Sequence, residues 1–130
     1  MSNANLYAAL RAAFPPDLDT TAVETVGAGG GLHYSWRDLD RASAMMANLL
    51  DSLRLPARSR IAVQVEKSVE ALILYLAVLR AGHVFLPLNT AYTPDEVDYF
   101  IGNATPRIFL CDGARAGALA PVAARHGARL

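Results

Sequence analysis

Cysteine is almost absent from this chain: Cys111 is the single cysteine among 130 residues. One thiol can form no disulfide within the chain, so a disulfide-stapled fold is excluded. The three histidines, His33, His83 and His126, are scattered and lack the spacing of a metal site. These scarcities favour a reducing, cytoplasmic location.

The chain also lacks an excess of either charge, because twelve lysines and arginines balance twelve aspartates and glutamates. Without a net field, neither nucleic acid nor an anionic membrane surface is an expected partner. The longest apolar run, from Val69 to Leu79, has eleven residues. A membrane-spanning helix needs about 20, so this run predicts a core helix. The amino-terminal segment lacks the basic start and long apolar stretch of a secretory signal.

Apolar residues are plentiful, at 53% of the chain against 18% charged residues. This composition excludes intrinsic disorder, and the length suits one compact unit or one piece of a larger domain. Because the chain has no net charge, any partner must be recognised by particular residues at a local site.

The most glycine-dense stretch, residues 25–35, reads TVGAGGGLHYS. A phosphate-binding loop would need a helix directly after the glycines, and the spacing G-x-G-x-x-G is absent. Branched and aromatic residues flank the glycines on both sides, in segments 21–26 and 32–36. This pattern favours a β-hairpin, with a phosphate loop as the less favoured alternative.

Helical patterns surround this hairpin. A short helix is predicted through Leu6, Leu10 and Phe14, and the pair Pro15-Pro16 ends it. A longer helix is predicted after Ser35, with Asp38 completing a capping box. The predicted apolar face of this helix contains Trp36, Leu39, Met46, Leu50 and Leu53. The opposite, polar face contains Arg37, Asp40, Arg41, Asn48 and Asp51. Met45 and Met46 are both predicted to fill the core.

From residue 60 onward strands and helices alternate. Strands are predicted at 60–65, 83–88 and 107–112, with helices capped by Ser68 and Thr93 between them. A last helix is predicted to begin near Gly117, which would place Pro121 in its first turn. The alternation predicts an α/β fold: an amino-terminal hairpin followed by parallel βαβ units. Residues 128–130 look like the opening of one more strand, so the chain is expected to be the front part of a longer protein.

Three ordered motifs lie between Gln64 and Ile101. A helix ends in Arg80-Ala81-Gly82, a strand ends in Pro87-Leu88-Asn89, and Tyr92-Thr93 leads into an acidic helix start. With Ser35, Trp36 and Leu39 upstream, this pattern resembles the amino-terminal subdomain of the AMP-forming acyl-CoA synthetases. That adenylate-forming superfamily also contains the adenylation domains of peptide synthetases.

Within the superfamily, EKSVEAL and LPLNTAYT resemble the malonyl-CoA and methylmalonyl-CoA synthetases most closely. Thr90 stands where many relatives have proline. His83 and Cys111 are departures from the family pattern with no assigned role.

The resemblance implies a two-step reaction. The carboxylate of malonate or methylmalonate attacks the α-phosphate of ATP, and the thiol of CoA then displaces AMP from the acyl-adenylate. It also implies the cofactors ATP, Mg²⁺ and CoA, and a small carboxyl-terminal domain that moves between the two steps. In the family, the phosphate loop, the magnesium pair, the ribose aspartate and the catalytic lysine all lie beyond Leu130.

Residues 1–130 are accordingly expected to be the amino-terminal portion of the large AMP-binding domain. Its partner would be the remainder of its own chain. We expect no catalytic, cofactor-binding or metal-binding residue in this segment, which would act as scaffold and be inactive alone.

Glu66, Lys67 and Ser68 are the strongest functional candidates, because they follow a strand at the edge where open α/β sheets bind ligands. Tyr92 and Thr93 are better explained as a packed aromatic and a helix cap.

The remaining polar candidates have structural explanations. His33 is expected at the surface of the hairpin, and His83 near exposed carbonyls after a helix end. Asp95, Glu96 and Asp98 form an acidic cluster that the start of a helix favours electrostatically, and a metal site there is not expected.

Two other functions stay open. The chain could belong to an amino-acid-activating adenylation domain that passes its product to a carrier-protein thiol. It could also be a stand-alone α/β binding module that shares only ancestry with the synthetases.

Overall fold

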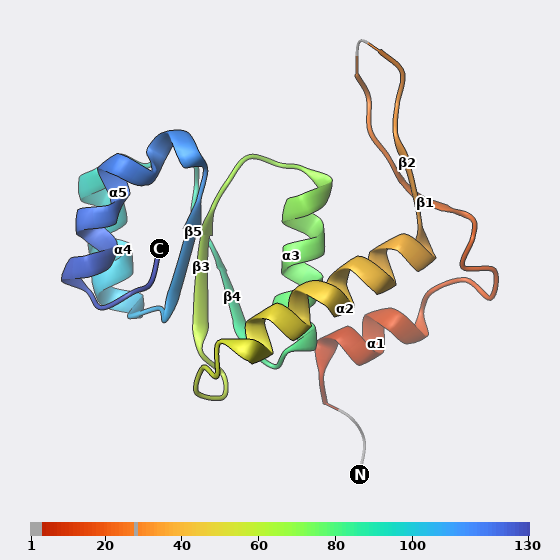
Figure 1. Ribbon diagram of the computed structural model, residues 1–130, viewed down its shortest axis with the longest axis horizontal. Coiled ribbons are helices and arrows are strands. Elements are labelled where there is room, and N and C mark those ends of the chain that lie inside the picture. Colours follow the sequence, from red (N-terminus) through yellow and green to blue (C-terminus); the bar gives the residue numbers. More distant parts are fainter. Residues whose placement is uncertain (1–3, 28) are drawn as a thin grey trace. The chain divides into compact units, whose positions relative to one another are not determined.

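The computed structural model describes residues 4–27 and 29–130, and these contain helices α1 to α5 and strands β1 to β5 (Figure 1). The chain divides into two compact units. The first comprises Met1–Arg54 and Ser68–Gly82, and the second comprises Leu55–Lys67 and His83–Leu130. Among the described residues, no helix has the length and apolar character needed to cross a membrane.

The first unit contains three helices and a two-stranded sheet. Its elements are α1 (Leu6–Ala12), β1 (Thr21–Glu24), β2 (His33–Ser35), α2 (Trp36–Ser52) and α3 (Val69–Arg80). Its core gathers Tyr7 of α1, Leu39 of α2, and Val69 and Leu76 of α3. Each of the three helices therefore turns an apolar side toward this core.

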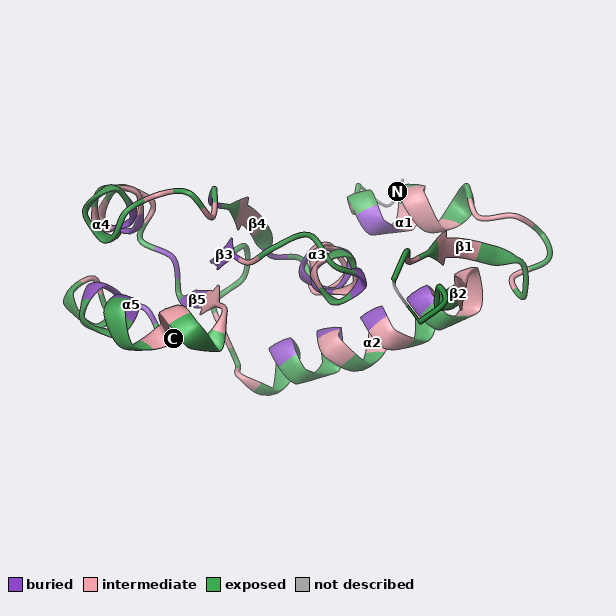
Figure 2. Ribbon diagram, turned by 90° about the horizontal axis from the view of Figure 1, so that it is seen from above, coloured by how far each residue is buried: buried purple, intermediate pink, exposed green. Residues whose placement is uncertain are grey.

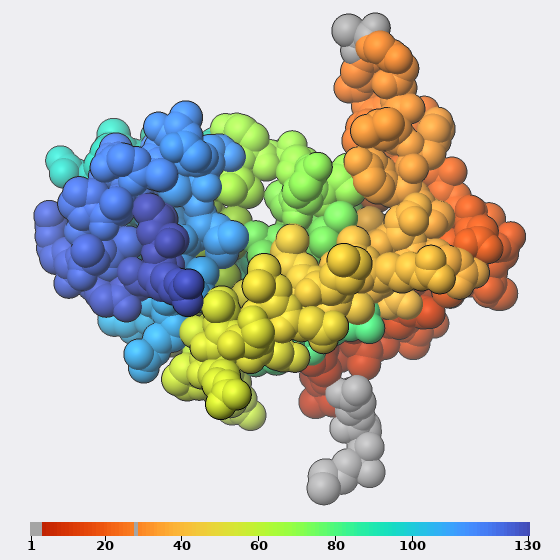
Figure 3. Space-filling model, viewed as in Figure 1, coloured from red at the N-terminus to blue at the C-terminus, as the bar shows by residue number. Residues whose placement is uncertain are grey.

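The glycine-dense stretch connects an antiparallel hairpin, as predicted. Strand β1 pairs with β2. Beyond the strands, the backbone amide of Thr25 donates to the carbonyl of Leu32 over 2.9 Å. Gly31 is required there, because a Cβ atom on it would lie 2.2 Å from the Thr25 carbonyl oxygen. A strand follows the glycines, which argues against a phosphate loop; Ala28, within the same stretch, lies outside the described residues. The hairpin stands out from the rest of its unit (Figure 3).

Helix α2 begins as predicted, because the side chains of Ser35 and Asp38 form a reciprocal capping box. Its buried residues lie along one side (Figure 2): Leu39, Ser43, Ala47 and Leu50. The prediction that Met45 fills the core is wrong, since this residue is 74% exposed. Met45 lies two residues, or about 200°, from Ser43 and Ala47 in the buried stripe, so it faces away.

The second unit is a parallel sheet with helices on one face. It contains β3 (Arg60–Gln64), β4 (Val84–Pro87), α4 (Pro94–Ala104), β5 (Ile108–Cys111) and α5 (Gly113–Arg125). The strand order is β4-β3-β5, with every pair parallel. Helices α4 and α5 lie on the same side of this sheet (Figures 1 and 2). The core between them includes Ala62, Val97, Ile101, Phe109 and Leu119.

The expected further strand at 128–130 has a counterpart, because Arg129 forms a parallel bridge with Ile108. The predicted start of the last helix is wrong. Helix α5 begins at Gly113 and contains Pro121 in its interior. Pro121 is exposed, and burial of Leu119 and Val122 on the same helix offsets the hydrogen bond that the proline cannot make.

Candidate functional site

A cavity of about 460 Å³ opens at the carboxyl edge of the parallel sheet. Parallel strands bring their carboxyl ends together, so the residues that follow β3 and β4 meet there. The cavity is lined by Val65, Glu66, Lys67, Pro87, Leu88, Asn89 and Thr90. Its volume is within the usual range for small-molecule sites, and this edge is where open α/β sheets bind ligands.

Glu66, Lys67 and Ser68, which the sequence suggested as one functional group, have different roles in the structure. Glu66 and Lys67 are exposed and line the cavity with opposite charges. Ser68 instead caps α3 in the first unit, where its side-chain oxygen accepts a hydrogen bond from the amide of Ala71 over 3.1 Å. Glu66 and Lys67 therefore remain the cavity's ionisable candidates, and Ser68 has a structural role.

Two side chains hold the turn that follows β4. Gln64 Nε2 donates to the carbonyl of Asn89 over 2.7 Å. Arg115 donates from Nη1 to the carbonyl of Thr90 over 2.6 Å, and from Nη2 to that of Tyr92 over 2.9 Å. Sequence reasoning missed both donors because their acceptors lie 23 to 25 residues away. The available signal was a polar glutamine inside an otherwise apolar strand.

Gln64 is fully buried, and its Oε1 has no hydrogen-bond partner among the described residues. His83 is also buried, at 9% exposure, and its Nδ1 is likewise without a partner there. Buried polar atoms are nearly always paired, so such exceptions require an explanation. His83 follows the end of α3, and its expected position near helix-end carbonyls stays a prediction.

Tyr92 and Thr93 have the structural roles that the sequence favoured. The ring of Tyr92 stacks on that of Phe100 with centroids 4.9 Å apart. The hydroxyl of Thr93 accepts from the amide of Glu96, whose carboxylate accepts from the amide of Thr93. The predicted capping box of α4 is confirmed.

The acidic cluster at the start of α4 is divided among different partners. Glu96 serves the capping box, whereas Asp98 lies 2.6 Å from Nη1 of Arg125 and 3.0 Å from Nε2 of His126. Over the residues that the structure describes, no group of three histidine, cysteine, aspartate or glutamate side chains could hold a metal ion.

His33 and Cys111 show no features of catalytic groups. The side chain of His33 is 59% exposed on the hairpin, 3.7 Å from the carboxylate of Glu24, as the surface prediction required. Burial raises the pKa of the Cys111 thiol above 9.0, and the nearby Asp112 carboxylate adds to the effect. The thiol is therefore protonated at neutral pH, which makes it a poor nucleophile.

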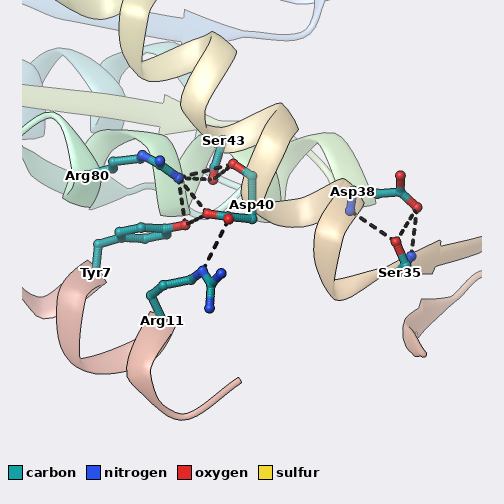
Figure 4. A network of polar contacts seen from close by, with 7 residues as sticks. All are labelled: Tyr7, Arg11, Ser35, Asp38, Asp40, Ser43 and Arg80. Carbon is teal, nitrogen blue, oxygen red and sulfur yellow. Dashed lines mark hydrogen bonds and ion pairs between the residues drawn. The ribbon is translucent and has the colours of Figure 1, made fainter. Parts of the chain in front are cut away.

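A second polar cluster connects the three helices of the first unit (Figure 4). Asp40 Oδ1 accepts hydrogen bonds from the hydroxyl of Tyr7 and from Nη1 of Arg80, and Oδ2 lies 3.1 Å from Nε of Arg11. The prediction that Asp40 lies on the face of α2 opposite the apolar residues is wrong, because its carboxylate contacts α1 and α3 and its side chain is only 26% exposed. The three donors come from α1 and α3, so the sequence pattern of α2 alone could not predict these contacts.

The ionisation of this cluster follows from its contacts. Burial opposes the charge on Asp40, but the hydrogen bonds from Tyr7, Arg80 and Arg11 prevail and lower its pKa below 3.8. Burial, together with the hydrogen bond to Asp40, raises the pKa of Tyr7 above 10.0, so its hydroxyl keeps the proton that it donates. These contacts join α1, α2 and α3, and the arrangement is that of a structural tie.

An antiparallel hairpin, a separate parallel sheet and a cavity at the carboxyl edge of that sheet define a protein of the α/β class. Residues 11–129 match the family of AMP-binding enzymes, and the chain belongs to that family. The resemblance to the adenylate-forming enzymes, and the fold that it implied, are thereby confirmed.

Solved structures extend this result. MatB from Rhodopseudomonas palustris is 46% identical over 98% of this chain, with a TM-score of 0.89. A benzoate CoA ligase from Burkholderia xenovorans LB400 is 22% identical over 97% of the chain, with a TM-score of 0.82, a level that shows a shared fold alone. This chain spans about a quarter of either protein, at 25% of each.

Peptide synthetases are also similar. Nonribosomal peptide synthetase 4 from Gibberella zeae is 29% identical over 93 residues, which cover 72% of this chain and 1% of that protein. Tyrocidine synthase 1 from Brevibacillus parabrevis is 32% identical over 76 residues, which cover 58% of this chain and 7% of that protein.

Proposed function

We propose that this chain is the amino-terminal portion of the large AMP-binding domain of an ATP-dependent acyl-CoA synthetase. The enzyme joins malonate or methylmalonate to CoA and releases AMP and pyrophosphate, with Mg²⁺ accompanying ATP. The chain itself acts as scaffold, and the residues that hold ATP, Mg²⁺ and CoA belong to the remainder of the protein. A cytoplasmic location is part of the same proposal.

One observation carries the choice of acid. MatB, a malonyl-CoA synthetase, is 46% identical to this chain over 98% of its length. An acyl-CoA synthetase from Brucella canis and the benzoate CoA ligase are only 21% and 22% identical. The difference favours a dicarboxylate of the malonate class over an aromatic acid such as benzoate. MatB has also been solved with ATP bound, at the same identity, which supports ATP as the activating nucleotide.

The test is acid-dependent formation of AMP by the full-length protein, with ATP, Mg²⁺ and CoA present. Malonate and methylmalonate are compared with acetate and benzoate at equal concentrations. We expect the highest kcat/KM with one of the two dicarboxylates. A preference for acetate or benzoate would refute the proposed acid, and AMP formation with none of them would refute the synthetase itself.

The similarity to peptide synthetases supports a second candidate, an amino-acid-activating adenylation domain. Such a domain exchanges pyrophosphate into ATP when an amino acid is added, without any need for CoA, and transfers its product to a carrier domain. Exchange that depends on one amino acid and is indifferent to malonate would establish this alternative.

A further inference from the structure

We infer that Gln64 and Arg115 are positioning residues: they fix the backbone of the turn from Asn89 to Tyr92 and thereby shape the ligand cavity at the carboxyl edge of the sheet. The inference rests on the proposed function, because its main readout is the synthetase reaction. It goes further by assigning a role to two side chains that do not themselves line the cavity.

The hydrogen bonds converge on a short segment. Within four consecutive residues, the carbonyls of Asn89, Thr90 and Tyr92 each accept a side-chain donor. Gln64 reaches the turn from β3, and Arg115 reaches it from the first turns of α5. The planar guanidinium of Arg115 engages two carbonyls at once, which fixes their relative orientation as well as their distance.

The turn needs such support because it lies outside regular structure, between the end of β4 and the cap of α4. The hydrogen bonds within the turn are local. The amide of Ala91 donates to Oδ1 of Asn89 over 2.9 Å, and the amide of Tyr92 donates to the carbonyl of Asn89 over 3.1 Å. These bonds give the turn its shape, whereas Gln64 and Arg115 hold it against the sheet and against α5.

Gln64 is an unusual residue for a buried position in β3. The side chain is fully buried, yet Oε1 has no partner among the described residues. A leucine of similar volume would leave no polar atom unpaired. The amide is therefore not explained by core packing, and the one hydrogen bond described for it is that to the carbonyl of Asn89.

The turn also forms part of the cavity wall, through Asn89 and Thr90. A shift of the turn would move that wall relative to Glu66 and Lys67 on the other side. A small displacement of a binding wall can weaken the binding of a substrate, even when the altered residue lies outside the site.

The experiment uses the full-length enzyme and two variants, Gln64→Leu and Arg115→Ala. KM and kcat are measured separately for malonate, ATP and CoA, with the other two substrates saturating, and the equilibrium Kd for ATP is measured by calorimetry. We expect each variant to raise at least one of the three KM values by about threefold or more, with kcat changed less than about twofold. Gln64→Leu is expected to do so without lowering Tm, which a purely structural role could not produce.

Arg60→Ala is the matched control. Nη1 of Arg60 also donates to a backbone carbonyl in the same unit, that of Ala104 over 3.0 Å, and Arg60 does not line the cavity. This variant should leave all three KM values unchanged. If Gln64→Leu and Arg115→Ala also leave every KM and the Kd for ATP within about twofold of wild type, the positioning role is refuted.

Failure of the proposed function gives a different result. A wild-type protein that forms no AMP with any acid but binds ATP refutes the proposed reaction, and the Kd for ATP of the variants then decides the positioning role. A wild-type protein that neither turns over nor binds ATP refutes both.

Discussion

Individual side chains in this protein act through partners that are distant in sequence. Asp40 is surrounded by donors from residues 7, 11 and 80, and its charge is stabilised only when all three helices are in place. Arg80 interrupts an otherwise apolar helix, and its guanidinium also lies 4.7 Å from the ring centroid of Tyr7. Arg80 and Asp40 therefore form an ion pair, which explains why each helix carries a charged residue on the side that faces the other helices.

We expect Asp40→Asn to destabilise the protein by roughly 2 kcal/mol, between the values for exposed and buried ion pairs, because Arg80 and the hydroxyl of Tyr7 lose their charged acceptor. Thermal unfolding of the full-length protein measures this as a fall in Tm. Asp51→Asn is the matched control, because Asp51 is an exposed aspartate on the same helix. Equal effects of the two substitutions would show that the cluster contributes nothing.

The same variant provides a pH test. The pKa of Asp40 is lower in the folded protein than its ordinary value of 3.8, so its stabilising effect is complete above that value and is lost as pH falls through the folded-state pKa. The difference in Tm between wild type and Asp40→Asn should stay constant from about pH 7 to about pH 5 and shrink below about pH 4. A difference that remains constant to about pH 3 would contradict the assignment.

Glu66 and Lys67 line the cavity, yet we expect them to contribute little to catalysis. Both are exposed and carry opposite charges, so together they add little net field. Glu66→Ala and Lys67→Ala in the full-length enzyme should each change kcat by less than about tenfold. A larger loss, with Tm unchanged, would make this corner part of the catalytic machinery and refute the scaffold role.

The helices of the second unit are joined by a close contact as well as by the core. Gly102 of α4 faces the ring of His126, which follows α5. A Cβ atom at Gly102 would lie 2.8 Å from Cε1 of that ring. The same ring lies 3.0 Å from the carboxylate of Asp98. The absence of a side chain at residue 102 thus allows α4 and the end of α5 to pack closely.

Gly102→Ala is expected to destabilise the protein by about 1 kcal/mol, because displacement of the His126 ring outweighs the gain in helix propensity. In a His126→Ala background the sign should reverse, since the clash is gone and alanine favours the helix by about 0.5 to 1 kcal/mol. Tm values of the two single variants and the double variant test this. Gly117→Ala on α5, where a Cβ atom meets nothing within 4 Å, should stabilise in either background. The same sign for Gly102→Ala in both backgrounds would refute the role of His126.

At the level of the entire chain, each unit leaves apolar surface exposed. In the first unit Met45 and Leu49 of α2 are 74% and 61% exposed. In the second unit Val84, on the outer strand β4, is 45% exposed. A contiguous exposed apolar patch and an uncovered strand edge are features that stable monomers avoid.

Residues 1–130 produced alone should therefore bind an apolar dye or self-associate, whereas the full-length protein should do neither. Dye fluorescence and size-exclusion chromatography of both proteins make the comparison. If residues 1–130 prove monomeric, free of dye binding and cooperative in unfolding, they form a stand-alone α/β module, and the scaffold proposal is refuted.

The order of helices and strands followed from the sequence, because caps, turns and apolar periodicity act over four residues or fewer. Ser35, Ser68 and Thr93 each cap the helix that was predicted for them. The parallel sheet could also be predicted from the sequence, because a helix between two consecutive strands leaves few ways of placing those strands in one sheet. The family resemblance rested on motifs within this same local order.

Only the tertiary structure revealed the contacts that unite these elements. In the folded protein Asp40 pairs with Arg80, Met45 faces solvent and Pro121 lies inside α5. Gln64 and Arg115 both donate to carbonyls of one turn. Each outcome depends on side chains tens of residues away or on burial of a whole helix face. The free energies of these long-range contacts exceed the local conformational preference of a single residue. They cannot be predicted from a short stretch of sequence, because the contacting residues are far apart in the chain.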